Sequence, residues 1–562
     1  MEQQNKSNTY AWWAFLLYAV AFVAYTWPLC LHFSTSFIGR PETGDASTYV
    51  WNIWHFRYAV VNGLNPFFTD KLFYPEGTSL LMHAYTPIAG LLNLLINRPI
   101  LTLNIVLLFS FVLSGLGTFQ LLKHFGIHPL LCMAGGFIFA FCPYKTAHLA
   151  EHFNLELTAC IPYFILYVFK TFQFTPGRWL PAIQSRRSLW LLILICMLSL
   201  LSDYYYSIYL FYFTCIFATA NALLPAFKKL SLIKKIIGIL LVVMIGHITV
   251  RLLSIIGVDD KGALWWNPDF ASLFVPPSDN ILFKNMGWVR VFENRYFRYP
   301  ESTEFIIFPG LCMLALLFIY FFKNKWQTPL QIQPMNTAAF VFLSLCFPIV
   351  VFMGHQLFYS GGGLVYFIPF LNNVRTPSRY ILMAILMALP ALLWVASQYS
   401  RHRYFTSAAI ALITLVFSEF YPVRYTMLNN KNVPEVYAHL KQMPQGAVLP
   451  LPFGMRDGTM ERGHFNTNHY FYQTIHEKPI IGGYISRLSK AALQQIENSS
   501  TARECLSIMD NKGNIYPIQK IDLPVKYIVV EDKKFEAYMD SAMELQSMTK
   551  TAYGNYLLYE IK

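Results

Sequence analysis

Long apolar segments constrain the fold of this chain more than any other feature of its sequence. Several windows of about 17–24 residues carry almost no charge, which is the length a helix needs to cross a hydrocarbon core of roughly 30 Å. Hydrophobic residues make up 55% of the chain and charged residues only 13%. The sequence therefore predicts an α-helical polytopic membrane protein and excludes a soluble enzyme with one anchor.

The apolar pattern predicts eleven membrane-spanning helices. The first, from Ala11 to Leu31, has no small-residue cleavage site after it, so it is expected to be retained rather than removed as a signal peptide. The predicted spans are 11–31, 99–122, 128–143, 156–173, 188–202, 204–224, 232–256, 304–322, 336–354, 379–398 and 404–421.

Basic residues set the expected orientation of these spans. Alternate connections, together with Lys6, hold 14 of the 43 basic residues and only one of the 30 acidic residues. The whole net charge of +13 therefore lies on one side, which the positive-inside rule identifies as the cytoplasm. The apolar stretch 86–99 is too short to span, so we expect it to lie in the interface or to re-enter. The N-terminus is then cytoplasmic and the C-terminus external.

Two regions are predicted along the chain. Residues 1–423 form the transmembrane domain, with external loops at 32–98, 257–303 and 355–377. Residues 424–562 lose the long apolar runs and regain mixed charge, so we expect an external α/β domain. Within it, 433–443 and 490–497 have helical spacing, whereas 446–453, 525–532 and 553–561 read as short buried strands.

Two carboxylates open an aromatic stretch of the first external loop. Glu42 and Asp45 precede "STYVWNIWHFRYAVV", whose composition fits a helix lying along the membrane surface. Asp45 falls at the start of this helix, so its side chain is either a helix N-cap or a reactive group. The residues alone leave both interpretations open.

The first loop also resembles a known family. "GDASTYVWNIWHFRYAVVNG", "NPF", "YPEG" and a short apolar helix near "TP" are similar to the first external loop of bacterial GT-C-type membrane glycosyltransferases. The resemblance implies transfer of a sugar from a polyprenyl-phosphate donor to a glycan, lipid or protein acceptor at the outer face of the inner membrane. It implies that an acid of this loop is the base, here Asp45, with Glu42 as the second candidate. The chain has no P-loop for a nucleotide, and no D-x-D pair in a soluble domain.

Cations for the donor phosphate are expected at the outer ends of the spans. Arg375 and Arg379 flank Pro377, and Arg251 lies near the end of another apolar segment. Arginine can bind phosphate through two nitrogens, although each of these side chains could instead extend to the lipid headgroups. His55 and Arg57 of the aromatic helix complete the expected phosphate-binding set.

A short motif suggests a metal. "HLAEH" (148–152) matches the H-x-x-E-H pattern of some metallopeptidases, and its spacing places His148 and His152 on one helical face. The alternatives are a peptidase, a structural polar loop, or a site for a divalent metal or phosphate formed by His148, His152 and Glu156. If a metal binds, Mg²⁺ or Mn²⁺ is expected. Asp203 is expected to mark a turn, with acceptor or metal contact as the alternative. Glu301 and Glu304 are expected to cap a helix, with acceptor contact as the alternative.

Other functions remain compatible with the sequence. A transporter or flippase-like carrier of lipid-linked saccharide should place ionisable residues near the bilayer midplane, whereas the polar candidates here gather at the outer face. A non-catalytic membrane scaffold predicts that Asp45 is dispensable.

Overall fold

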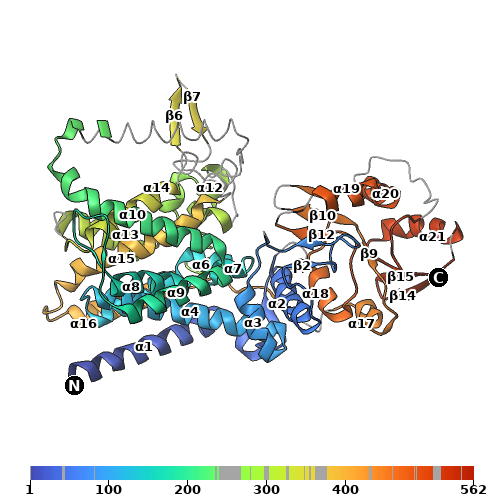
Figure 1. Cartoon of the computed structure of the whole chain (residues 1–562), viewed down its shortest axis with the longest axis horizontal. Coiled ribbons are helices and arrows are strands. Elements are labelled where there is room, and N and C mark those ends of the chain that lie inside the picture. The colour runs from blue at the N-terminus through green and yellow to red at the C-terminus, as the bar shows by residue number, and fades with distance from the viewer. Residues whose placement is uncertain are drawn as a thin grey trace.

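A computed structural model describes most of the chain. The described residues are 2–40, 45–81, 83–234, 237–238, 268–278, 280–296, 303–323, 328–346, 349–353, 356–360, 376–429, 433–457, 460–486, 488, 490–509, 521–545 and 547–562. Figure 1 shows a helical body joined to a mixed segment of helices and strands, with α2 and α3 of the first loop between them.

The helical body contains a helix in ten of the eleven predicted spans. Most of the eleventh, 232–256, lies outside the described residues. Four segments are long and apolar enough to cross a membrane: Pro99–His124, Pro129–His148, Tyr204–Lys229 and Pro377–Ser397. The helices of the body are α1 (Glu2–Tyr25), α4 (Pro99–His124), α5 (Pro129–Phe141), α8 (Cys160–Thr171), α9 (Arg186–Ser202), α10 (Tyr204–Lys229), α13 (Leu311–Lys323), α14 (Gln333–Leu345), α15 (Ile381–Ser397) and α16 (Phe405–Glu419).

One predicted span ends early. The sequence predicts a helix over 336–354, but α14 ends at Leu345 and the strand β6 (Ile349–Met353) follows, paired with β7 (Gln356–Ser360). Pro348 cannot donate a helical hydrogen bond, and the β-branched run Ile349–Val351 favours an extended backbone. Apolar character alone did not distinguish this strand from a helix.

The first loop is built around two packed helices. It contains β1 (Ser36–Ile38), α2 (Ala46–Val61), β2 (Phe68–Thr69), β3 (Thr78–Ser79) and α3 (Pro87–Ile96). We expected α2 to lie along the membrane surface, but most of its side chains are buried by protein. Gly90 of α3 lets the ring of Phe56 approach its backbone, so the two helices pack closely. The aromatic residues of α2 serve protein packing rather than the headgroup zone.

The C-terminal segment combines three sheets with short helices. Its elements are β8 (Met427–Asn429), α17 (Glu435–Gln442), β9 (Val448–Leu451), β10 (Gly454–Asp457), β11 (Glu461–Gly463), α18 (Asn468–His476), β12 (Gly483–Ile485), α19 (Lys490–Asn498), α20 (Ser500–Met509), β13 (Tyr527–Val530), α21 (Glu536–Leu545), β14 (Met548–Tyr553) and β15 (Tyr556–Ile561). The strands are ordered β14-β15-β13-β9 in one sheet and β11-β10-β12 in another, whereas β8 pairs with β1 of the first loop.

The C-terminal segment is fastened to the first loop by buried polar contacts. The indole N–H of Trp51 donates to the side-chain oxygen of Gln473 at 2.6 Å, and Trp51 is fully buried. The Gln473 amide donates in turn to the carbonyl of Lys71 at 2.6 Å. The backbone N–H of Phe73 donates to the carbonyl of Gly482 at 3.0 Å. Because these groups lie away from water, separating the two parts would leave them unsatisfied.

Candidate active site

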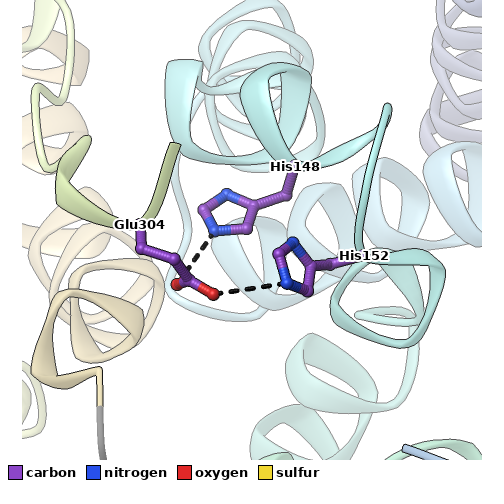
Figure 2. A group of neighbouring side chains, drawn as sticks. All are labelled: His148, His152 and Glu304. Atoms are coloured by element: carbon purple, nitrogen blue, oxygen red, sulfur yellow. Dashed lines mark hydrogen bonds and ion pairs between the residues drawn. The ribbon is translucent and has the colours of Figure 1, made fainter. Parts of the chain in front are cut away.

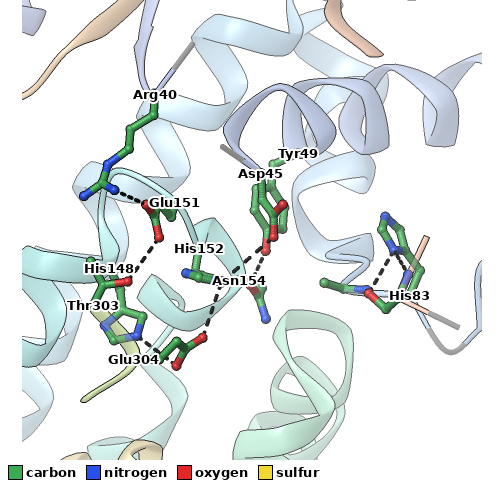
Figure 3. Close-up of polar contacts among 12 residues, drawn as sticks. Arg40, Asp45, Tyr49, His83, His148, Glu151, His152, Asn154, Thr303 and Glu304 are labelled. Atoms are coloured by element: carbon green, nitrogen blue, oxygen red, sulfur yellow. Dashed lines mark hydrogen bonds and ion pairs between the residues drawn. The ribbon is translucent and has the colours of Figure 1, made fainter. Parts of the chain in front are cut away.

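Four separate parts of the chain meet at one polar site. Asp45 lies directly before α2, and His148, Glu151 and His152 lie where α6 (Pro143–His148) gives way to α7 (Phe153–Glu156). Glu304 belongs to the short helix η4 (Thr303–Phe305), and Arg379 belongs to η7 (Pro377–Tyr380) at the start of α15. Figure 3 shows Asp45, the two histidines and Glu304 drawn together from these elements.

Three side chains of the site have the spacing of metal ligands. The Nε2 atom of His148 lies 3.3 Å from Oε2 of Glu304, and Nε2 of His152 lies 3.4 Å from Oε1. One ligand atom from each of the three residues lies within 4.8 Å of the others (Figure 2). Ligand atoms around a tetrahedral zinc ion are separated by a comparable ~3.3 Å, given Zn–N bonds of about 2.0–2.1 Å.

Hydrogen bonding aims the histidine nitrogens into the group. Nδ1 of His148 lies 2.7 Å from the carbonyl of Tyr144, so Nδ1–H donates there and Nε2 faces Glu304. Metal-binding histidines commonly have such a backbone partner on their second nitrogen. Burial lowers the pKa of His152 to about 3, so this ring is neutral near pH 7. Two imidazole nitrogens that face a carboxylate supply the donor set of a divalent cation.

An arginine orients the carboxylate. Arg379 donates from Nη2 and Nε to the two oxygens of Glu304, at 2.5 and 3.3 Å. The guanidinium of Arg379 is the counter-charge of the buried Glu304 carboxylate. A fork of two hydrogen bonds also fixes the plane of the carboxylate.

Asp45 is not used as a helix cap. It precedes α2, but its side chain makes no capping hydrogen bond, and only its carbonyl accepts from the N–H of Thr48. Its Oδ2 atom lies 3.9 Å from Nε2 of His152. Burial raises the pKa of Asp45 to about 6, while the charge of Arg456 lowers it in part. The carboxylate is therefore poised between its two protonation states near neutral pH.

Two further acids near the site are paired. Glu151 accepts from Arg40 at 2.9 Å and from the hydroxyl of Thr303 at 3.1 Å, so it ties η4 to the first loop. Glu156, which we expected as a metal ligand, is absent from the group of ligand atoms and lies 3.7 Å from Nζ of Lys145, with both side chains fully buried. The carboxylate of the candidate metal group is therefore that of Glu304 and not, as the sequence predicted, that of Glu156.

A chain of hydrogen bonds beside the site connects α2, α7 and the start of α10. The hydroxyl of Tyr49 donates to Asn154 at 2.5 Å, and the Asn154 amide donates to Asp203 at 2.6 Å. Asp203 also accepts from the N–H groups of Tyr205 and Tyr206, so it caps α10 as the turn interpretation expected. The start of α10 is thereby connected to α7 and to α2.

The remaining expected residues lie elsewhere. His55 is buried, stacks on Trp51 and contacts the carbonyl of Phe68 at 3.2 Å. Arg57 donates to Asn97 and to the carbonyl of Leu94, at the end of α3. Both are about ten residues along α2 from Asp45, a distance of about 15 Å. Glu42, Arg251, Glu301 and Arg375 lie outside the described residues.

Sequence reasoning missed the contribution of distant segments. Glu304 was noted only as a helix cap with substrate contact as an alternative, and its ligand role depends on a contact with His148 that is 156 residues away. Arg456 and Tyr484 of the C-terminal segment were not singled out. No local motif marks them, because they reach Asp45 only through the docking of α18 on α2.

Comparison with known proteins identifies a family and several similar structures. The family model described as "Domain of unknown function (DUF6311)" matches residues 14–418. No curated protein matches the chain in sequence.

The similar solved structures are membrane glycosyltransferases of the class that the first loop resembles. One is the oligosaccharyltransferase AglB from Archaeoglobus fulgidus, in complex with an inhibitory peptide and a dolichol-phosphate. It has 10% identity and a TM-score of 0.42, and the match covers 100% of this chain and 74% of that one. An Archaeoglobus fulgidus oligosaccharyltransferase in complex with Zn and sulfate has 12% identity and a TM-score of 0.42, with 98% and 73% covered. The arabinofuranosyltransferase AftD from Mycobacteria has 14% identity and a TM-score of 0.42, with 98% and 41% covered.

Proposed function

The chain belongs to the DUF6311 family, and for this member of it we propose the function of an inverting membrane glycosyltransferase. The donor is a polyprenyl-phosphate sugar, and the acceptor is a hydroxyl group presented at the outer face of the bacterial inner membrane. The observation that carries the proposal is the carboxylate of Asp45, which is free of a capping role and faces His152 with a pKa raised to about 6.

Asp45 acts as the general base. As the acceptor oxygen bonds to the anomeric carbon, the bond from that carbon to the phosphate oxygen breaks, and its electron pair leaves with the phosphate. The hydroxyl proton passes to Asp45. One carboxylate suffices for inversion, because the leaving phosphate needs no protonation by an acid. A base with a pKa near the working pH is the most effective one.

His148, His152 and Glu304 would hold a divalent metal ion. Their fit rests on the donor set, two imidazole nitrogens and one carboxylate whose ligand atoms lie within 4.8 Å of one another. When bound, the ion would offset negative charge on the donor phosphate. Two imidazoles and one carboxylate favour Mn²⁺ or Zn²⁺, since Mg²⁺ prefers oxygen ligands. Of the two ions we expected, Mn²⁺ fits this donor set better than Mg²⁺.

The position of the site supports a lipid-linked donor. His148 ends the candidate span Pro129–His148, Asp203 precedes the span Tyr204–Lys229, and Arg379 begins the span Pro377–Ser397. The site therefore gathers at one end of three apolar segments. Basic residues stand at or just beyond the other end of two of them, at Lys228–Lys229 and Arg401. A reacting group carried on a polyprenyl chain would arrive at such a position.

Mass spectrometry of copurifying lipids tests this function. The detergent-solubilised wild type is compared with Asp45→Asn and with the control Asp70→Asn, which changes an exposed acid of the same loop. We expect a polyprenyl-phosphate sugar to accumulate on Asp45→Asn only, and its mass identifies the sugar. Equal amounts of a lipid-linked oligosaccharide on all three proteins would indicate a carrier and contradict the proposal.

A further inference from the structure

The described cations around the site are almost all committed to carboxylates. Arg40 pairs with Glu151, Lys145 with Glu156 and Arg379 with Glu304. A phosphate leaving the anomeric carbon gains negative charge, and fixed cations near it lower the barrier. An arginine already bound through both oxygens of a carboxylate has few donors left for this purpose.

Arg456 is a cation of the site that lacks such a partner. It lies on β10, the central strand of its sheet, directly opposite Tyr484 of β12. Met455 is fully buried, and side chains alternate along a strand, so Arg456 projects from the other face of the sheet. Glu461 lies opposite on β11, yet Arg456 forms no ion pair with it or with any other described carboxylate.

The guanidinium group of Arg456 lies over the face of the Tyr484 ring. The Cζ atom of Arg456 lies 4.9 Å from the centre of the Tyr484 ring. An arginine stacked in this way keeps its N–H groups in the plane, where they remain available to phosphate oxygens. The stack leaves the five donors of Arg456 free while restricting the orientation of the side chain.

The stacked pair adjoins the proposed base. Burial and the nearby carboxylate of Asp45 raise the pKa of the Tyr484 hydroxyl. The guanidinium of Arg456 partly offsets the effect of burial on the pKa of Asp45, although the two side chains form no ion pair. The guanidinium is thus close enough to share a substrate with Asp45 without neutralising it.

The C-terminal segment is positioned firmly enough to contribute to a site. The hydroxyl of Ser47 donates to Asn468 at 3.3 Å, which joins the starts of α2 and α18. The N–H of Tyr484 donates to the hydroxyl of Tyr470 at 3.1 Å, and the ring of Tyr470 contacts Trp51. Tyr484 is therefore fixed relative to α2, the helix that follows Asp45.

We propose that Arg456, oriented by its stack on Tyr484, binds the phosphate of the donor, so that the C-terminal segment completes the active site. The proposal rests on the glycosyltransferase function and names a substrate-binding residue for it. It also explains why the aromatic helix of the first loop is buried beneath the C-terminal segment.

Binding of a short donor analogue tests the assignment. The full-length protein in detergent is titrated with farnesyl phosphate, and with farnesol as the probe that lacks the phosphate. Arg456→Gln should weaken binding of farnesyl phosphate at least tenfold, and Arg456→Lys should weaken it less. Neither change should alter binding of farnesol. Arg462→Gln is the matched control, because Arg462 is 60% exposed and its one ion pair among the described residues is with Glu497 at 3.5 Å.

The outcomes separate this inference from the function on which it rests. Equal binding of farnesyl phosphate by wild type and Arg456→Gln overturns the role of Arg456, while accumulation of donor on Asp45→Asn would still support transfer. A wild type that binds farnesyl phosphate no better than farnesol overturns both. Weakening by Arg462→Gln to the same extent would show a general charge effect and would also overturn the assignment.

Discussion

Asp45 combines a position at a helix start with a carboxylate that the helix does not use. Acids at that position usually accept from the first N–H groups, which lowers their pKa. Here the side chain points to His152 and burial raises its pKa instead. The sequence could place Asp45 before a helix, but its rotamer depends on neighbours more than a hundred residues away.

The raised pKa makes Asp45 costly to the folded state at neutral pH. Its pKa of about 6 lies about two units above the ordinary 3.8, equivalent to about 3 kcal/mol of destabilisation once the group is ionised. The penalty is absent below pH 4 and grows as pH rises to about 6. We therefore expect Asp45→Asn to raise the melting temperature at pH 7.5 in the presence of a chelator. The same comparison at pH 4 should show no gain, and a loss at pH 7.5 would contradict the cause given for the shift.

Activity should follow the same titration. Because the base must be ionised, kcat/KM is expected to fall about tenfold per unit as pH drops below about 6, and to level off above it. The measurement is a pH profile of sugar transfer under conditions where the protein stays folded. A profile that is flat between pH 5 and 7 would exclude Asp45 as the base.

Glu304 and Arg379 should behave as a buried pair in which each needs the other. Both side chains are only 12% exposed, so Glu304→Gln leaves a guanidinium without its counter-charge. We expect a loss of about 3–5 kcal/mol in unfolding free energy, partly recovered in Glu304→Gln/Arg379→Gln. Thermal unfolding in detergent measures it, with the exposed pair of Arg462 and Glu497 as a reference expected to change by under about 1 kcal/mol. No recovery in the double variant would mean that the pair is not coupled.

At the scale of elements, the sequence predicted most helices and several C-terminal strands. The segments 433–443, 446–453, 525–532 and 553–561 contain α17, β9, β13 and β15. The pattern of apolar residues suffices there, because β9 and β13 are short apolar runs that are buried at every position. It failed for 336–354, where apolar residues continue from a helix into a hairpin. It also failed for the environment of α2, because aromatic residues suit a membrane interface and a protein interface equally.

The hydrogen bond between α2 and α18 gives a test of that environment. Trp51→Phe keeps a ring in place but leaves the side-chain oxygen of Gln473 without its donor. We expect a loss of about 1–3 kcal/mol and faster proteolysis between the two parts. Trp54→Phe is the control, since Trp54 is only partly buried and stacks on Tyr58. Equal protease sensitivity of Trp51→Phe and wild type would show that this contact does not hold the C-terminal segment.

At the scale of the whole molecule, the basic connections predict that the first loop and the C-terminal segment both lie outside the cytoplasm. The two parts pack on each other, which agrees with that prediction. We expect alkaline phosphatase fused after Lys562 to be active and a fusion after Lys123 to be inactive. The reverse pattern would overturn the assignment of the basic connections to the cytoplasm.

The pairing of the first loop with the C-terminal segment has a consequence for how the protein is made. The strand partners of Ser36–Ile38 and the acceptors for Phe73 and Tyr74 are synthesised about 400 residues later. Contacts between residues so far apart in the sequence form slowly. During synthesis the loop therefore remains unpaired until residues 427–482 have been made. A product truncated before these residues leaves the strand edge of the loop open to proteases and chaperones.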